Sequence, residues 1–136
     1  MIDMLDMTDQ QLNKELAILM GYKVVAHDHY RHQLIAPEGC SSKYLEVTEM
    51  EAWRGAPNYC LNPAASLEVQ AVAINKDEEG YIRNWLLNKH GKSVMAFTAV
   101  SLRTAAEIAN SSPRERAEAA YMTLSSQDLH PLREDI

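Results

Sequence analysis

The chain has 136 residues, a hydrophobic fraction of 46% and a net charge of −6, which is typical of a globular protein whose single domain buries one core. The acidic balance argues against binding to nucleic-acid polymers or anionic membranes, because such binding depends on lysine and arginine side chains that neutralise phosphates. Small anionic ligands are not excluded, since a few arginines can hold a phosphate locally.

The first residues, 1–6, have neither the basic start nor the apolar run of a signal peptide. No segment approaches the ~20 apolar residues that a membrane span needs. We therefore expect a cytoplasmic protein without membrane contact. In a reducing cytoplasm the two cysteines, Cys40 and Cys60, are expected to remain free thiols.

The first predicted helix begins at the capping box Thr8-Asp9-Gln10-Gln11, in which two side chains satisfy each other's backbone N–H groups. Leucines follow at helical spacing until Gly21, which suits a left-handed helix end. Two strands are predicted next, over residues 22–29 and 30–36. Pro37-Glu38-Gly39 is expected to close this hairpin as a turn.

Residues 40–61 show no clear period, which indicates a long loop with a short helical turn at residues 47–53. Loops of this length inside a compact domain commonly carry function. A helix is predicted to begin at Asn62-Pro63, because asparagine accepts hydrogen bonds from free helical N–H groups and proline has no N–H to leave unpaired. We expect this helix to end before Asp77. Its apolar face is expected to contain Leu67, Ala71 and Ile74.

A second hairpin is predicted further along the chain. Residues 81–88 and 93–100 are rich in β-branched and aromatic side chains, and they flank His90-Gly91, which suits a tight turn. Trp85, in the first of these strands, is expected to lie in the core or at an interface, since an indole offers a large apolar area with one polar N–H.

Residues 101–109 allow two interpretations. Their alternation suits a continuing strand, whereas Thr104-Ala105-Ala106-Glu107 has the form of a capping box at a helix start. The next start signal, Ser112-Pro113-Arg114-Glu115, combines an N-cap, a proline at the first helical position and a box-forming glutamate. It predicts a last helix, with Ala117, Ala120, Tyr121 and Leu124 at helical spacing.

The predicted order is helix, hairpin, helix, hairpin, helix. This order favours an α+β fold, and we expect a single-domain α/β/α sandwich in which a mixed or antiparallel sheet lies between helical layers. The domain spans residues 1–136, with residues 1–7 and 126–136 as loose ends.

Three segments, in this order, share the features of one family of small proteins. They are Leu12-Asn13 with Leu16-Ala17 and Met20-Gly21-Tyr22; Pro57-Asn58-Tyr59 with Ala64-Ala65 and Leu67-Glu68-Val69; and Ser112-Pro113-Arg114-Glu115-Arg116-Ala117 with Ala119-Ala120 and Leu124. Together they resemble the phage ABA sandwich domain family, whose members are small α/β/α proteins of bacteriophages and prophages. The resemblance covers residues 8–125. It implies a phage origin and a sandwich fold, and it brings no established activity.

The long loop contains the first candidate ligand site, formed by Trp53, Arg54 and Tyr59 with Asn62 at the start of the next helix. Flat aromatic rings can stack on a nucleobase, a guanidinium can bind a phosphate through two hydrogen bonds, and the adjacent Gly55 permits close backbone approach. The alternative is that both aromatic rings fill the core beneath the loop.

Arg114 and Arg116 form a second candidate, at the start of the last helix. A basic side chain there faces the positive end of the helix dipole, and a bound anion would relieve that unfavourable interaction. Alternatively, Glu115, Glu118 or another chain neutralises the two arginines.

His27 and His29 alternate on a predicted strand, so their imidazoles could share one metal ion. A zinc site needs a third protein ligand, which the sequence does not supply at a suitable spacing. We therefore expect neither a metal nor another cofactor. The chain also has no nucleophile motif, phosphate loop or dinucleotide fingerprint, which predicts a protein that is not an enzyme.

Together, the residues and the family resemblance favour a phage-encoded, non-enzymatic binding protein that forms a homo-oligomer in the cytoplasm of the bacterial host. Its expected ligand is a small anionic or nucleotide-type molecule, such as a defence signal of the host that the protein sequesters. The alternative is a phage accessory protein that binds and blocks a host protein. A second alternative is a metal-dependent hydrolase built on His27 and His29.

Overall fold

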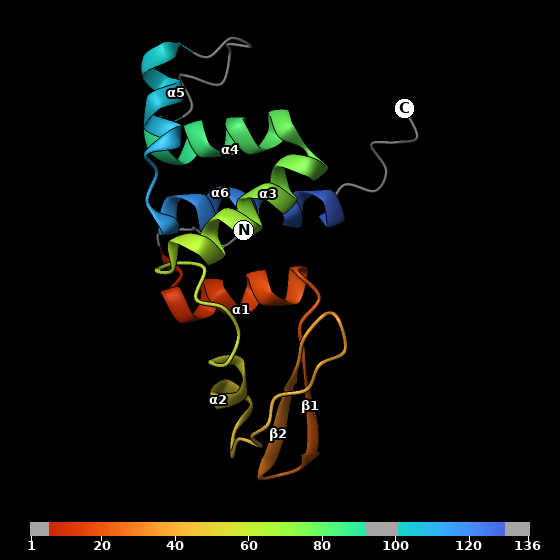
Figure 1. The fold of residues 1–136 in the computed structure, drawn as a ribbon. Coiled ribbons are helices and arrows are strands. Elements are labelled where there is room, and N and C mark those ends of the chain that lie inside the picture. The colour runs from red at the N-terminus through yellow and green to blue at the C-terminus, as the bar shows by residue number, and fades with distance from the viewer. Residues whose placement is uncertain (1–5, 92–100, 130–136) are drawn as a thin grey trace. The chain divides into compact units, whose positions relative to one another are not determined.

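The fold is α+β, as the sequence predicts (Figure 1). A computed structural model describes residues 6–91 and 101–129, and the chain groups into two compact units, residues 1–58 and residues 59–136. Within the described residues, the first unit contains an antiparallel two-stranded sheet with helices, and the second unit is helical. The single domain over residues 1–136 stays a prediction.

Helix α1 (Asp9–Leu19) begins at the predicted capping box. The N–H of Gln11 donates to Thr8 Oγ1 at 3.1 Å, and the N–H of Thr8 donates to the Gln11 side chain at 2.8 Å. Gly21 follows the helix with a φ of +103°, a left-handed conformation that favours glycine. A Cβ there would also lie only 3.1 Å from Cβ of Pro37. The buried residues of α1 are Leu12, Asn13, Leu16 and Ala17.

Strands β1 (Lys23–Asp28) and β2 (Arg31–Ile35) form the predicted antiparallel hairpin, with a bulge just before Asp28. The Asp28 carboxylate fixes the turn between them, because it accepts the N–H of Tyr30 at 2.8 Å and Nε of Arg31 at 2.6 Å. The hairpin therefore closes immediately after Asp28.

The turn predicted at residues 37–39 follows the hairpin instead of closing it. It leads into residues 41–46, which run antiparallel to β2 through two isolated bridges. His32 and Glu46 exchange two backbone hydrogen bonds of 2.8 Å each. These bonds hold in place a segment that has no periodic pattern in the sequence.

Helix α2 (Glu49–Trp53) is the short helix predicted within residues 47–53. Thr48 caps it by accepting the N–H of Glu51 at 3.1 Å, and the helix packs against both strands of the sheet. The layering in this unit is therefore one short helix on one two-stranded sheet.

The second unit packs three helices, α3 (Pro63–Lys76), α4 (Glu78–His90) and α6 (Pro113–Leu129), with α6 in contact with both others (Figure 1). The buried residues of α3 and α6 are mostly small, which lets two helices approach closely. The larger buried side chains come from α4. Buried on these three helices are Ala65, Ser66, Val69 and Ala73 of α3, Tyr81, Trp85 and Leu86 of α4, and Ala117, Glu118, Ala119, Ala120, Thr123 and Leu124 of α6.

The predicted apolar face of α3 is wrong. Leu67 and Ala71 are exposed and Ile74 is half-buried, whereas the face of Ala65 and Val69 is buried. Apolar residues occur all round this helix, so its periodicity does not single out one face. The face with the smaller side chains packs in the core because it permits the closer approach.

The second predicted hairpin is wrong at its first strand, because residues 78–90 form the helix α4. Asp77 caps this helix and accepts the N–H of Gly80 at 3.0 Å. Two glutamates follow in the first turn, where negative charge interacts favourably with the helix dipole. Gly91, with a φ of +88°, ends the helix, so the glycine read as a hairpin turn is a helix stop.

Packing explains why residues 78–90, whose aromatic side chains are typical of a strand, form a helix. Tyr81 and Trp85 are four residues apart, so a helix places them on one face, and both are buried. Trp85 lies in the core, one of the two positions expected for it. The second predicted strand, residues 93–100, lies outside the described residues.

The segment with two interpretations forms helix α5 (Leu102–Ala109). Its cap is Ser101, whose hydroxyl oxygen accepts the N–H of Thr104 at 3.1 Å. The helix therefore begins one turn before the capping box proposed at Thr104.

Helix α6 begins at the predicted capping box. The N–H of Glu115 donates to Ser112 Oγ at 3.1 Å, and the N–H of Ser112 donates to Glu115 Oε1 at 2.9 Å. The helix continues to Leu129, so residues 126–129, predicted as the start of a loose end, are helical.

The cap of α3 gives a first stability prediction. Asn62 Oδ1 accepts the N–H of Ala64 at 2.9 Å and that of Ala65 at 3.3 Å. We expect Asn62→Ala to lower the free energy of unfolding by about 1 kcal/mol, measured by urea denaturation followed by circular dichroism. Asn62→Asp keeps the acceptor and should stay within about 0.5 kcal/mol of the wild type. Equal losses in the two variants would contradict the capping role.

Glu115 gives a second prediction, on pH. Its carboxylate accepts Lys89 Nζ at 2.7 Å, which joins α6 to α4. Partial burial raises the pKa of Glu115, but the Lys89 ion pair and the Ser112 N–H outweigh burial and bring it below the ordinary 4.5. A carboxyl with a lowered folded-state pKa stabilises the fold above its unfolded pKa, and this stabilisation is lost as the pH falls through the folded-state value.

Below pH 4.5, the wild type should therefore lose stability more steeply than Glu115→Gln, which cannot titrate. Thermal unfolding at a series of pH values measures both slopes. Parallel curves for the two proteins would show that the pair contributes nothing.

Candidate functional site

The six residues predicted to bind a ligand fall into two separate units. Trp53 and Arg54 belong to residues 1–58, and Tyr59, Asn62, Arg114 and Arg116 belong to residues 59–136. Trp53 is 5% exposed and Tyr59 is 1% exposed, so neither ring has an open face on which a base could stack. Both rings have the burial expected from the alternative in which they fill a core.

A small charged cluster on α1 and α2 holds Trp53. Its indole N–H donates to Glu49 Oε2 at 3.0 Å, and Lys14 Nζ lies 3.7 Å from that oxygen and 5.8 Å from the indole centroid. The indole hydrogen bond is the largest cause that lowers the pKa of Glu49, and the Lys14 charge adds to it. The polar N–H of Trp53 is therefore engaged inside the protein.

Arg54 is exposed at the end of α2. The neighbouring Gly55 does permit close approach, and the group that approaches it is a side chain of the same unit. A Cβ at this position would lie 3.3 Å from Leu34 Cδ2 and 3.3 Å from the Ala52 carbonyl oxygen. Trp53 and Gly55 therefore pack within the first unit, whereas Arg54 is exposed to solvent.

Arg114 is neutralised within its own helix, as the alternative interpretation expected. Its Nε donates to Glu118 Oε2 at 2.9 Å, one turn further along α6. Its Nη1 also lies 3.9 Å from Cys60 Sγ. This contact between Arg114 and Cys60 connects the start of α6 to the residues before α3. Asn62 likewise uses its amide oxygen to cap α3.

Arg116 has a different environment, since it reaches from α6 to α3. Its Nη1 donates to the Oγ of the buried Ser66 at 2.9 Å. Beside it, Tyr81 donates its hydroxyl to Gln70 at 2.8 Å; burial raises the pKa of Tyr81 well above its ordinary range, and the Arg116 charge opposes that rise. Among the residues that the structure describes, no carboxylate lies within ion-pair distance of Arg116. Its remaining N–H groups are thus not paired with a described carboxylate.

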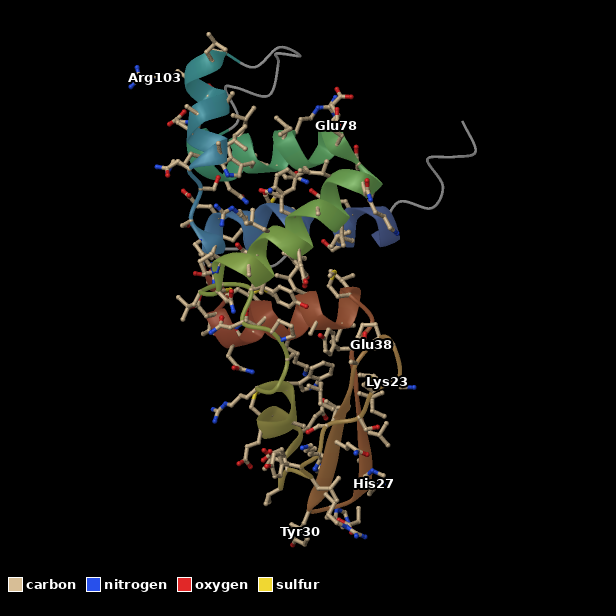
Figure 2. All side chains as sticks on the ribbon, in the orientation of Figure 1. Lys23, His27, Tyr30, Glu38, Glu78 and Arg103 are labelled. Carbon is tan, nitrogen blue, oxygen red and sulfur yellow. The ribbon has the colours of Figure 1, made fainter. Side chains whose placement is uncertain are left out.

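The two histidines considered as metal ligands are both exposed, and Figure 2 shows His27 near the turn of the hairpin. His27 Nε2 lies 3.0 Å from Gln33 Oε1. Across residues 6–91 and 101–129, no three His, Cys, Asp or Glu side chains are grouped so as to hold a metal ion. Cys40 is exposed and Cys60 is buried.

The first unit contains a groove that the sequence did not predict. The α1–α2 groove has a volume of about 370 Å³ and is lined by Asp6, Met7, Gln11, Lys14, Glu15 and Met50. A partial signal was present, because Gln11, Lys14 and Glu15 share one face of the first helix, beside the face of its leucines. The approach of Met50 from α2 depends on the tertiary fold and has no counterpart in the sequence pattern.

Residues 44–50 form a second unpredicted surface feature, the apolar segment. It has four exposed large apolar side chains: Tyr44, Leu45, Val47 and Met50. It includes the bridged residue Glu46 and runs into α2. Met50 belongs to both the apolar segment and the α1–α2 groove.

No described helix is both long enough and apolar enough to cross a membrane. Comparison of the chain with models of protein families, with curated proteins and with solved structures found no match. The resemblance to the phage ABA sandwich domain family therefore stays a prediction.

Proposed function

We propose that this protein is a phage-encoded, non-enzymatic binding factor that acts in the cytoplasm of a bacterial host by holding a host protein. The observation that carries the proposal is the apolar segment, in which Tyr44 is 72% exposed and Val47 is 56% exposed. Exposed apolar side chains that occur together on a protein surface commonly mark a site that a partner covers.

The backbone of the apolar segment supports this role. Glu46 is paired with His32 of β2 through two hydrogen bonds, and Thr48 caps the helix that follows. A segment that is already ordered loses little conformational entropy when a partner binds. The exposed side chains are thus presented on a preorganised backbone.

A protein partner also agrees better with the aromatic residues than a nucleotide does. Trp53 and Tyr59 are the side chains best suited to stack on a base, and both are buried. Tyr30 and Tyr44 are exposed instead, and tyrosine is enriched where proteins contact proteins.

The proposal is tested with the immobilised full chain and host lysate. We expect one stoichiometric protein to be captured by the wild type and lost with the double variant Tyr44→Ser, Val47→Ser. The matched control is Leu61→Ser, Leu67→Ser, which removes two exposed apolar side chains of the second unit. Capture by the control and not by the first variant supports the proposal, whereas equal capture by both or no captured protein contradicts it. Light scattering on the free chain tests the proposed homo-oligomer.

Capture of a small anionic ligand is a second candidate, favoured by Arg116. Its guanidinium reaches the buried Ser66 on α3 and has no described carboxylate as a partner. A phosphate could accept the remaining N–H groups. Calorimetry with cyclic di- and trinucleotides and ADP-ribose should then show binding that Arg116→Gln abolishes and Arg103→Gln, on α5, retains. Recovery of a cleaved ligand, or no heat with any of them, would exclude this function.

A further inference from the structure

The α1–α2 groove allows a more specific statement about the partner, which rests on the proposed function. We infer that this groove binds a basic amphipathic helix of the partner protein. Apolar side chains of that helix would contact Met7 and Met50, and its lysine or arginine side chains would pair with Asp6 and Glu15. The basis is the combination of apolar lining, uncompensated negative charge and length along α1.

The apolar part of the groove consists of methionine. Met7 is buried and Met50 is exposed, so one forms part of the floor and the other stands at the surface. Methionine is unbranched and polarisable, which lets it adapt to side chains of different shape. The volume of about 370 Å³ lies within the range of sites that hold ligands of a few hundred cubic ångströms.

The charge of the groove determines which sign of charge a partner segment must carry. Lys14, the basic side chain of the lining, already lies 3.7 Å from the carboxylate of Glu49. Asp6 and Glu15 have no ion-pair partner among the described residues. The charge left unbalanced in the groove is therefore negative, which attracts a basic segment and repels an acidic one.

The direction of the groove favours a helix over a compact small molecule. Gln11 and Glu15 lie four residues apart on α1, and Ile18 continues the same face for a further turn. Ile18 is exposed, so the apolar surface extends beyond the groove along the helix. An amphipathic helix that lies alongside α1 can contact this whole length through side chains three and four residues apart.

The test uses the full chain and a labelled probe, a short helical peptide with leucine on one face and lysine on the other. Its control peptide has glutamate in place of every lysine. Fluorescence anisotropy should show binding of the lysine peptide and none of the glutamate peptide. We expect the double variant Asp6→Asn, Glu15→Gln to bind about tenfold more weakly, because two exposed ion pairs with the peptide are lost.

The matched control is Glu38→Gln, Glu78→Gln, which changes the net charge equally at two exposed carboxylates that do not belong to the lining of the groove. It should bind the lysine peptide like the wild type. Equal weakening in both double variants would show attraction to overall charge only, and would overturn the inference. So would binding of the glutamate peptide, or no binding of the lysine peptide.

The outcome is separable from that of the lysate experiment. If the Asp6, Glu15 variant still captures the host protein while the peptide fails to bind, the inference is wrong and the proposed function stands. If the peptide binds the groove and no host protein is captured by the wild type, the proposed function fails while the groove retains its specificity.

Discussion

Replacing Trp85 with alanine is expected to lower the free energy of unfolding by about 3–5 kcal/mol, the usual loss when a buried tryptophan is truncated. Trp85 is fully buried on α4, and its indole N–H donates to Ser111 Oγ at 2.8 Å. Truncation would remove the largest side chain of this core and leave the buried hydroxyl of Ser111 without its indole donor. Both effects act in the same direction.

Urea denaturation followed by far-ultraviolet circular dichroism measures the loss. Ser111→Ala removes the hydrogen bond and keeps the ring, so it should cost about 1 kcal/mol and thereby separate the two effects. Leu102→Ala serves as the control, because Leu102 is 91% exposed and should change stability by about 0.5 kcal/mol or less. A loss below about 1 kcal/mol for Trp85→Ala would show that the tryptophan does not support this core.

The starts of α1, α3 and α6 were predictable from the sequence because capping is local. Thr8, Asn62 and Ser112 each satisfy N–H groups two or three residues away, so the whole interaction lies within one short window. The hairpin was predictable for a similar reason, since its two strands are adjacent in the chain. Its turn was misplaced because Asp28, and not the Pro-Gly segment, supplies the fixing hydrogen bonds.

Helix α4 could not be derived from its own residues alone. Tyr81 and Trp85 are aromatic, and aromatic residues are enriched in strands, so intrinsic preference favours a strand here. The helix is favoured by Asp77 at its start and by the burial of both rings in the core. The sequence contained the cap, but the Gly91 that ends the helix was assigned to a hairpin turn.

Whether the side chains predicted to bind a ligand can reach one depends on burial, which is a tertiary property. Trp53 and Tyr59 are rare, large side chains in a loop without periodic pattern, which is also how a stacking site appears in a sequence. The structure buries both and exposes Tyr44 and Val47, residues that carried no chemical motif. The surface that we propose for a partner, the apolar segment, was therefore the part of the loop in which the sequence showed no motif.

Replacing Trp53 with alanine is expected to lower the free energy of unfolding of the first unit by about 3–5 kcal/mol. The ring is 5% exposed, and its N–H is bound to Glu49, which Lys14 also contacts. Loss of the ring would remove its cation–π contact with Lys14 of α1 and leave the Glu49 carboxylate without its indole donor. Any binding lost in this variant would follow from loss of structure, so it could not identify Trp53 as a ligand contact.

The chain's two tryptophans allow this loss to be assigned to a unit, because Trp53 lies in residues 1–58 and Trp85 in residues 59–136. In the Trp85→Phe variant, tryptophan fluorescence reports Trp53 alone, and its urea titration gives the reference for the first unit. In Trp53→Ala, the fluorescence of the remaining Trp85 reports the second unit, while circular dichroism reports both units. Trp53→Phe keeps most of the apolar ring and should cost less than Trp53→Ala. Arg54→Ala, at an exposed position, should stay within about 0.5 kcal/mol. If Trp53→Ala unfolded at the wild-type urea concentration, the ring would not be part of the core, and its role as a ligand contact would have to be considered again.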